Sequence, residues 1–528
     1  MAPRKSSVLR SRSRTGARKP ADGEAARLQR LVVPGIQPPT PHQRQRLRRR
    51  EQEREAILKA FERKGAAAGF SVEELRRYMD RLSIVSIPAG GRIDSQGDRR
   101  DFVSVVGTGC VKTVVNPPVL DPTTEGIAQS ITVQFAKPTF VFGLAPVATA
   151  DAPDSFGAVA HVDSNVVVVR RDLMREIIAN TPAAGRLQLV AYHARGMSRL
   201  IYEKCVLAPL DVKQRLLRAL GQLARAFPLA GSPGEIDLPL THQDLAELVG
   251  ASRYTVLRAL ADLSGEVAVT RNRYALAKRL VARSVASAGR SASRRAPTVV
   301  AFRKRAPGAP RWTMNWLGLP RRIADLLVAG AQITTYEEGE RIASGDRLHA
   351  SVLWSGAARV MVATGDGHSV GAWIAKPGHF IGVGWGGERA DHARAFSAIA
   401  LERSEVAILK ESVMLDALGV SSADDVLRFL GSLHMALSRQ LYDRCVTLSL
   451  GNTERLLYQL ARLASDFPAR HPRGVEIALR LNPSRDVAPM VSMSRTVFSR
   501  AFSALRASRR LEVDGDGKLV VRRAHAIS

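Results

Sequence analysis

Two long stretches of the sequence repeat apolar residues at alternating steps of three and four, a spacing typical of a coiled-coil seam. The stretches lie 240 residues apart, and they predict two long helices that can pair with each other. One seam position is polar, His434, which we expect to be a tolerated seam residue; a pH-sensitive or register-setting role is the alternative. The seam residues are Leu187, Val190, Ala194, Met197 and Ile201, and then Leu427, Leu430, His434, Leu437 and Leu441.

Short alternating segments broken by glycine precede each long helix. Residues 102–109 and 165–169 have this pattern before the first helix, and residues 351–356 and 405–409 have it before the second. Such alternation predicts β-strands at the spacing of a sandwich or a barrel. The chain is therefore expected to place a β domain before each long helix.

The likeness between the two halves extends to residue identities. Residues 202–228 match residues 442–468 without a gap at 12 of 27 positions, whereas chance gives about two. We infer a unit of roughly 220 residues that occurs twice. The matched pairs include Tyr202/Tyr442, Cys205/Cys445, Arg215/Arg455 and Phe227/Phe467, and the same shift carries Phe140 onto Phe380, Ala160 onto Ala400 and Val166 onto Val406.

A helix-turn-helix pattern follows the first long helix, over residues 240–263. Thr241 is a good N-cap for a first helix, and Gly250 supplies the positive φ that ends it and makes the tight turn. Ser252 then caps a second helix, and residues 270–274 have the pattern of a hairpin turn, a wing. Arginine pairs bidentately with guanine, so the second helix is predicted to read base edges of DNA. Its outer face carries Arg253, Tyr254 and Arg258.

The second copy has a poorer version of this pattern. Residues 494–500 read Ser-Arg-Thr-Val-Phe-Ser-Arg, and residues 513–518 have the pattern of a wing turn. Ser492 replaces the turn glycine, and Pro483 replaces the capping threonine. Pro489 falls inside the expected first helix, where it removes a hydrogen bond and kinks the helix at a cost of ~3 kcal/mol. A second DNA-reading element is expected, in distorted form.

With the segment Ser-Arg-Tyr-Thr-Val-Leu-Arg at 252–258 and the hinge Leu210-Asp211 before it, the chain resembles the Crp/Fnr family of bacterial transcription regulators over about residues 70–280 and 315–525. The resemblance implies an α+β fold, a tandem repeat of a cyclic-nucleotide-binding-type β-roll, a long dimerisation helix and a winged helix-turn-helix. It also implies a sequence-specific transcription regulator that binds double-stranded DNA and RNA polymerase, and not an enzyme. The DNA-binding residues that it implies are Thr241, Ser252, Arg253, Tyr254, Thr255, Arg258, Arg271, Arg273, Ser494, Arg495, Thr496 and Arg500.

The patterns and the resemblance together divide the chain into segments. A basic disordered tail with a charged, solvated helix at 42–64 is expected over 1–69, and a basic flexible linker over 281–312. The β-rolls are expected at 70–180 and 313–420, the dimerisation helices at 181–208 and 421–448, and the winged helix-turn-helix domains at 209–280 and 449–528.

In the family, two identical chains bind a near-palindromic DNA site. One chain with two copies and a flexible linker can form the same pair internally, because the linker gives the second copy a high effective concentration. We therefore expect a single-chain pseudo-dimer, whose two half-sites differ because Tyr254 is matched by Thr496. The alternative is a homodimer of whole chains with four reading domains.

Most residues with which nucleotide-sensing members hold the cyclic phosphate are replaced. The family's Gly-Glu pair corresponds to Gly-Leu at 143–144 and Gly-Val at 382–383, so the glutamate that takes the ribose hydroxyl is apolar in both copies. Asp154 stands where the family has its phosphate-binding arginine, and it would repel a phosphate. Copy two retains an arginine, so Gly382 and Arg394 are the remaining candidate effector-binding residues. No response to cAMP is expected.

Large side chains, Phe156 and Phe396, stand at normally small positions of both expected pockets and predict that protein fills them. Cys205 and Cys445 occupy equivalent helix positions and are expected to be small buried residues, with a redox role as the alternative. The family's oxygen-sensing Cys cluster is missing, and no zinc-binding, catalytic or phosphate-loop motif is found. No metal, cofactor or catalytic residue is therefore expected.

Composition adds a strong positive charge. The 528 residues carry 78 Lys and Arg against 49 Asp and Glu, a formal charge of +29. Residues 1–64 have a net charge of +12, and residues 277–311 have ten basic residues and no acidic one. Basic disordered arms hold nucleic acid electrostatically, so the tail and linker are expected to contact phosphates; a solubilising role is the alternative. Two other functions stay open: an architectural nucleoid protein, and a scaffold that binds a partner through the β-rolls.

Hydrophobic residues make up 45% of the chain, which is enough for packed cores. No stretch approaches the ~18 apolar residues of a membrane span, and residues 1–19 lack the apolar core of a secretory signal. A soluble cytoplasmic protein, associated with the nucleoid and without a membrane partner, is expected.

Overall fold

The computed structural model describes residues 41–64, 72–117, 130–144, 147, 154–270, 273–277, 321–342, 349–364, 368–383 and 395–522. The linker expected at 281–312 and residues 1–40 of the expected tail lie outside this described part. The chain divides into two compact units, Met1–Glu55 and Ala56–Ser528. The described part of the first unit belongs to helix α2 (Pro41–Lys64), in agreement with the charged helix expected at 42–64.

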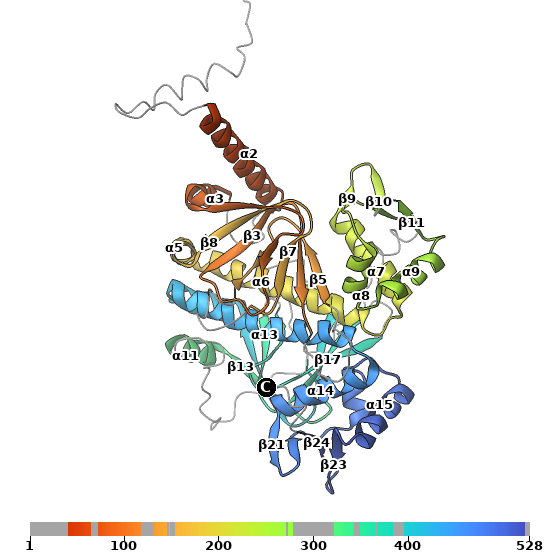
Figure 1. Cartoon of the computed structure of the whole chain (residues 1–528). Coiled ribbons are helices and arrows are strands. Elements are labelled where there is room, and N and C mark those ends of the chain that lie inside the picture. The colour runs from red at the N-terminus through yellow and green to blue at the C-terminus, as the bar shows by residue number, and fades with distance from the viewer. Residues whose placement is uncertain are drawn as a thin grey trace, which may run out of the picture. The chain divides into compact units, whose positions relative to one another are not determined.

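Two four-stranded antiparallel sheets form a β-roll in the first half of the second unit (Figure 1). The strands are β1 (Ser83–Ile87), β2 (Arg92–Asp94), β3 (Phe102–Thr108), β4 (Val111–Val115), β5 (Ile131–Ala136), β6 (Val141–Phe142), β7 (Gly157–Ala160) and β8 (Ser164–Arg170). Their orders are β1-β8-β3-β6 and β2-β7-β4-β5. Val166 pairs with Val85 on one side and Val106 on the other, so the run of valines lies in a central strand.

The second half contains a β-roll with the same strand orders, β13-β20-β15-β18 and β14-β19-β16-β17. The strands are β13 (Gln332–Tyr336), β14 (Arg341–Ile342), β15 (His349–Ser355), β16 (Ala358–Ala363), β17 (Ser369–Ala375), β18 (Phe380–Val383), β19 (Phe396–Ala400) and β20 (Ser404–Lys410). The number of residues between corresponding positions of the two rolls varies along the chain. The amide of Val106 donates to Phe140 and that of Leu353 donates to His379, so His379, and not Phe380, is the counterpart of Phe140.

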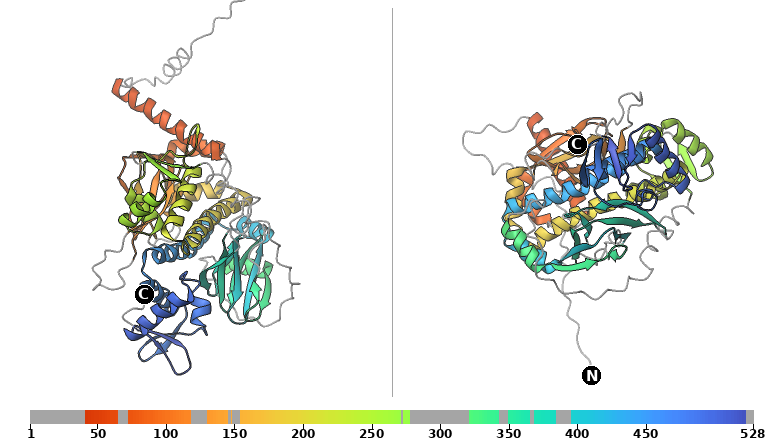
Figure 2. Two further views of the ribbon diagram at one scale, coloured as in Figure 1. Left: turned by 90° about the vertical axis from the view of Figure 1, so that its right-hand side faces the viewer. Right: turned by 90° about the horizontal axis from the view of Figure 1, so that it is seen from below.

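A long helix follows each roll, after a shorter one. These helices are α5 (Arg171–Asn180) and α6 (Ala183–Leu207), and then α12 (Glu411–Gly419) and α13 (Ala423–Ser449). All ten residues of the expected seams are buried, and nine of them, all but His434, belong to one apolar cluster. Helices α6 and α13 lie side by side (Figures 1 and 2). Arg186 donates to the carbonyl of Ser421 (2.8 Å), and farther along His193 bonds His434 (3.0 Å), so the two helices run in the same direction. No described helix is both long and apolar enough to cross a membrane.

A small domain with its own apolar core follows each long helix. The first contains α7 (Val212–Ala226), β9 (Pro228–Leu229), β10 (Ser232–Ile236), α8 (His242–Val249), α9 (Arg253–Asp262), β11 (Val267–Thr270) and β12 (Arg273–Leu276). The second contains α14 (Asn452–Asp466), β21 (Pro468–His471), β22 (Gly474–Ile477), a π-helix (Pro483–Val487), α15 (Arg495–Ala507), β23 (Leu511–Val513) and β24 (Leu519–Arg522). Their sheets are ordered β11-β12-β10-β9 and β21-β22-β24-β23.

The C-terminal part of α2 corrects the expectation of a solvated helix. Ile57 and Leu58 belong to the second unit, and both are buried in its main apolar cluster. Gly107 of β3 makes room for the first of them, because a Cβ at Gly107 would lie 2.8 Å from Cγ1 of Ile57. Two apolar residues among many charges thus anchor this end of the helix to the first β-roll.

Candidate nucleic-acid interface and ligand cavity

Helix α8 begins and ends as the sequence predicts. The Thr241 hydroxyl accepts a hydrogen bond from the Asp244 amide (3.1 Å), and the Asp244 carboxylate accepts one from the Thr241 amide (2.9 Å), which completes a capping box. Gly250 ends the helix at a φ of 65°. A Cβ at Gly250 would also lie 2.7 Å from the carbonyl oxygen of Leu448, so the turn needs glycine for conformation and for space.

Helix α9 presents an exposed basic face. Ser252 caps it by accepting from the Thr255 amide (3.1 Å), and the two hydroxyls also bond each other (2.8 Å). Arg253, Tyr254 and Arg258 are exposed, and neither arginine is paired with a carboxylate of a described residue. Tyr254 is 74% exposed, which is unusual for a large aromatic side chain. This face has the donors and the ring needed to contact the edges and backbone of a duplex.

The hairpin of β11 and β12 stands where the wing was expected. Thr270 pairs with Arg273 across the hairpin. Arg273 is exposed, whereas Tyr274 is buried in the core of the small domain. Arg271, in the turn, lies outside the described residues.

The second small domain corrects the expectation that its first helix has lost its cap. Asn482 is the N-cap and accepts from the Arg485 amide (3.2 Å). Pro483 takes the next position, where its missing N–H costs nothing. The π-helix ends at Val487, so Pro489 lies in the turn that follows and not inside a kinked helix.

Ser492 takes over the role of the turn glycine with strain. Its φ of 53° is close to that of Gly250, in the region that side chains other than glycine rarely adopt. Ser494 then caps α15 by accepting from the Val497 amide (3.4 Å), and Arg495, Thr496 and Arg500 are exposed. As in α9, neither arginine has a carboxylate partner among the residues that are described.

Sequence reasoning missed an ion pair that joins each small domain to its own β-roll. Lys112 on β4 contacts Asp244 (3.0 Å) and Glu247 (3.1 Å) of α8. Arg359 on β16 contacts Asp486 of the π-helix (2.7 Å). The two ion pairs occupy corresponding strands and helices. However, the number of residues that separates corresponding positions of the two copies is not the same in the β-rolls as in the small domains. A search without gaps therefore does not align the pairs.

A second missed connection uses the matched arginines of the repeat. Arg215 donates to the carbonyls of Leu207 (3.1 Å) and Val249 (3.2 Å), at the ends of α6 and α8. Arg455 donates to Leu450 (3.0 Å) and Val491 (3.3 Å) at the corresponding places. Each guanidinium thus ties the end of a long helix to the helix-turn-helix that follows it.

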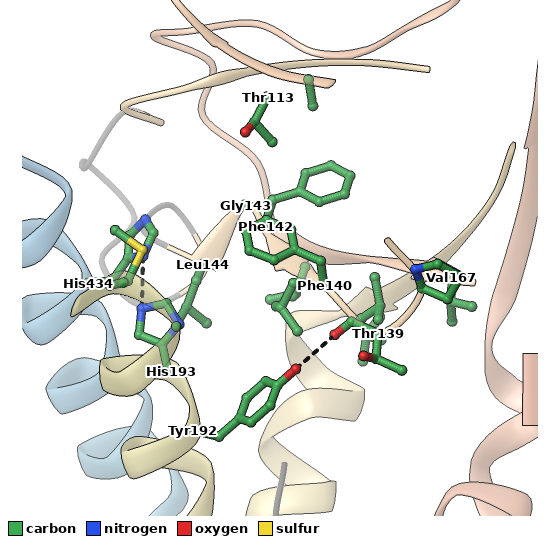
Figure 3. A pocket seen from close by; sticks show the side chains of 18 of the residues that line it. Thr113, Thr139, Phe140, Phe142, Gly143, Leu144, Val167, Tyr192, His193 and His434 are labelled. Carbon is green, nitrogen blue, oxygen red and sulfur yellow. Dashed lines mark hydrogen bonds between the residues drawn. The ribbon is translucent and has the colours of Figure 1, made fainter. Parts of the chain in front are cut away.

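The first β-roll contains a cavity of about 930 Å³, which corrects the expectation that protein fills this pocket. Its walls come from the sheets and from α6, and Figure 3 shows Phe140, Phe142, Leu144 and Val167 among them. Phe156 lines the cavity and leaves it open. The predicted effector residues belong to the other roll: Gly382 pairs with Ser351 there, and Arg394 lies outside the described residues.

Several polar groups line the cavity, among them the basic side chains of Lys137, Arg195 and Arg199. Arg100 binds Asp94 (2.7 Å), and Asp154 lies in the same wall, where burial, and next the Asp94 charge, raise the pKa of Asp154 to about 8. On the helix side, His193 of α6 and His434 of α13 bond each other (3.0 Å; Figure 3). Burial lowers the pKa of both imidazoles, that of His193 to about 4.

The corresponding region of the second roll carries larger side chains. Trp373 stands where the first roll has Gln134, and its ring lies 6.0 Å from that of Phe396. Val360 stands where the first roll has Thr113. The two rolls share a topology and differ in what their interiors can hold.

All three cysteines are buried. Burial raises the pKa of Cys205 and Cys445 to about 11. A thiol that is buried and protonated reacts slowly, so the structure favours the small-buried-residue interpretation over the redox one. Among the described residues, no group of three His, Cys, Asp or Glu side chains could hold a metal ion.

The chain is similar to known transcription regulators. The family model of the Crp-like helix-turn-helix domain matches residues 214–279. The CRP-like cAMP-activated global transcriptional regulator of Mycobacterium tuberculosis (strain CDC 1551 / Oshkosh) is 28% identical over 203 residues, 38% of this chain and 86% of that protein. The global nitrogen regulator of Synechococcus elongatus is 30% identical over 185 residues, 34% of this chain and 79% of that protein.

Among solved structures, that of FixK2 from Bradyrhizobium japonicum covers 39% of this chain and 96% of its own, with 22% identity and a TM-score of 0.32. The matched helix-turn-helix domain contains the capped helices α8 and α9. Together with the 30% identity over most of the cyanobacterial regulator, this shows that the chain belongs to the Crp/Fnr family of DNA-binding transcription regulators.

Proposed function

We propose that this protein is a sequence-specific transcription regulator in which one chain, with two tandem copies of the family unit, supplies both halves of a pseudo-dimer. The observation that carries the proposal is the parallel packing of α6 on α13. Because each small domain follows the C-terminal end of its long helix, parallel helices carry both domains at the same end. Two reading domains at one end can meet two half-sites of one duplex.

The proposed base-reading residues are Arg253, Tyr254 and Arg258 in the first domain. Their counterparts in the second are Arg495, Thr496 and Arg500. All are exposed within the first two turns of a capped helix. Since Tyr254 and Thr496 differ in size and in hydrogen bonding, the two half-sites are expected to differ in sequence. The proposed phosphate contacts are Thr241, Ser252, Thr255, Arg271, Arg273 and Ser494.

DNA binding is proposed to be independent of cAMP. The cavity of the first roll has Leu144 and Asp154 at the positions that correspond to the family's ribose and phosphate contacts. Asp154 thus replaces the cationic partner that the family offers the phosphate with a carboxyl group, which supplies no positive charge. In the second roll, Trp373 and Phe396 occupy the corresponding interior.

The test is selection of bound sequences from a random duplex library at near-physiological salt without added ligand. The proposal predicts two unlike half-sites about one helical turn apart, the first lost in Arg258→Ala and the second in Arg500→Ala. Arg506→Ala, an exposed arginine in the last turn of α15, is the matched control and should leave both halves.

Other results would favour other functions. Salt-sensitive binding without an enriched motif would contradict the proposal and favour an architectural protein, in which the charge of +29 dominates. Enrichment of the first half-site alone would make the second copy a structural partner. Unchanged gene control in cells after both arginine substitutions would favour a scaffold.

A further inference from the structure

We propose that the interface between the long helices accepts only unlike copies: copy one pairs with copy two, and neither copy pairs with a second copy of itself. Copy one is the unit that contains α5 and α6, and copy two is the unit that contains α12 and α13. The inference rests on the proposed function only for the pairing of the two copies, and not for the reading of DNA. It names the partner that each copy selects.

The two copies can be compared residue by residue where the long helices begin. The hydroxyl of Thr181 donates to the carbonyl of Ile177 (2.7 Å), and that of Ser421 donates to the carbonyl of Ala417 (2.7 Å). The two hydroxyls therefore occupy the same place in their copies, 240 residues apart. This spacing assigns four counterparts: Val426 to Arg186, Leu415 to Arg175, Ala184 to Asp424 and Leu433 to His193.

A single arginine serves both copies at this end of the helices. Arg186 donates to the carbonyls of Ile178 (3.1 Å) and Thr181 (2.8 Å) in its own copy. It also donates to the equivalent carbonyls of the other copy, those of Leu418 (3.0 Å) and Ser421 (2.8 Å). Its counterpart is a fully buried valine, which has no side-chain donor. Because the guanidinium reaches equivalent groups of both copies, it lies between them.

Either pairing of like copies would lose this arrangement. Copy one paired with itself would bring two arginines to one place, where like charges repel and both compete for the same carbonyls. Copy two paired with itself would bring two valines there, and the carbonyls of Leu418 and Ser421 would have no donor from the partner. An acceptor that is buried without a hydrogen bond is costly. The arginine thus fits once in each pair.

An ion pair across the interface is one-sided in the same way. Arg175 of α5 contacts Asp424 in the first turn of α13 (2.6 Å). The counterparts of these two residues, Leu415 and Ala184, are uncharged. Copy one paired with itself would lose the carboxylate, and copy two paired with itself would set Leu415 against Asp424. Because both partners are partly exposed, the contact adds little affinity and acts mainly on the choice of partner.

The histidine pair of the seam is a third contact between residues that are not counterparts. His193 bonds His434 (3.0 Å; Figure 3), whereas the counterpart of His193 is Leu433 and that of His434 is Ala194. In a pair of like copies, His193 would face Ala194, or His434 would face Leu433. Either imidazole would then lose this partner. Polar contacts in a helix seam select the partner in this way.

This selectivity limits how two chains can meet. The long helices of a second chain can be bound only where a copy one meets a copy two. Whole chains therefore cannot join through like copies, and the assembly with four reading domains formed in that way is disfavoured. Two chains could join through these helices only by exchanging copies.

The test exchanges contact residues between the two copies of the full chain and measures urea unfolding without DNA. In one triple variant copy one receives the residues of copy two: Arg175→Leu, Ala184→Asp and Arg186→Val. In the other, copy two receives those of copy one: Leu415→Arg, Asp424→Ala and Val426→Arg. Each imitates a pair of like copies and should lower the unfolding midpoint by about 0.5 M or more.

The variant with all six substitutions decides the outcome, because it restores unlike partners with their sides exchanged. It should unfold at a higher urea concentration than either triple variant. Losses that add, so that the six-residue variant is the least stable or does not fold, would overturn the proposal.

The matched control exchanges a different pair of counterparts. Asp172→Ser and Ser412→Asp exchange exposed residues in the first turns of α5 and α12, and should change the midpoint far less. Arg258→Ala and Arg500→Ala should unfold as the parent does, whatever their effect on DNA binding. A failure of the pairing proposal is thus distinct from a failure of DNA reading.

Discussion

At the scale of single residues, the histidine pair between the long helices makes stability depend on pH. Burial lowers the pKa of His193 to about 4 and that of His434 well below its usual value. Because the folded state binds fewer protons than the unfolded one, this stability is present above about pH 6.5 and is lost as the pH falls toward 4. At pH 5 the loss relative to pH 7 is about 2 kcal/mol for one such histidine.

The double variant His193→Leu and His434→Ala tests this, since each position receives the residue of its counterpart in the other copy, Leu433 or Ala194. We expect the urea midpoint to fall less between pH 7 and pH 5 than it does in the parent protein. Some dependence will persist because burial also lowers the pKa of His379 to about 4. An unchanged pH dependence would show that the pair does not titrate as described.

Several residue roles could be predicted from the sequence and others could not. Caps and turn glycines depend on a few neighbours, so Thr241, Gly250 and Ser252 were found correctly. Asn482 was missed because the cap shifts by one residue when proline takes the next position. The open space beside Phe156 depends on strands far away in the sequence, which a comparison of residue sizes cannot include.

At the scale of elements, the turns of the two helix-turn-helix units predict opposite effects of substitution. Ser492 adopts a φ of 53°, and its buried hydroxyl has no partner in the described part of the chain. Ser492→Gly should raise the free energy of unfolding by about 0.5–1 kcal/mol. Gly250→Ala should lower it by more, because the new Cβ also meets Leu448. Urea unfolding measures both, and a stabilised Gly250→Ala would contradict the assigned turn.

The ion pairs between the β-rolls and the small domains give a further prediction. Asp486 is fully buried, so Arg359→Met should cost about 2 kcal/mol by removing one of the two guanidinium partners of its carboxylate, while Arg485 (2.9 Å) remains. Lys112→Met should cost less, because Asp244 retains its bonds to Thr241. The control is Lys213→Met, whose pair with Asp262 is about half exposed and worth less than ~1 kcal/mol. Equal costs in urea unfolding would show that these contacts do not hold the domains in place.

The elements themselves were largely predictable because their signals are local. The seam spacing identified α6 and α13, and glycine-bounded alternation identified strands such as β3 and β8. The first helix of the second helix-turn-helix was not predicted correctly, because it is a short π-helix (Pro483–Val487). A π-helix differs from an α-helix by its hydrogen bonds and not by its residue pattern.

At the scale of the whole molecule, the proposed mode of DNA binding depends on the pairing of the two copies within one chain. Seam periodicity predicts that a helix seeks a partner, but not whether the partner belongs to the same chain. In the structure α13 is the partner of α6, and its residues complete the wall of the cavity in the first roll. The proposed pseudo-dimer thus depends on this interface.

The most direct test of the central claim is the number of chains bound to one duplex that carries both selected half-sites. Native mass spectrometry of the complex, at protein concentrations above and below the dissociation constant, gives this number. A single-chain pseudo-dimer should give one chain per duplex, with protection of both half-sites from cleavage. Two chains per duplex, or protection of a single half-site by one chain, would contradict the pseudo-dimer and favour a dimer of whole chains.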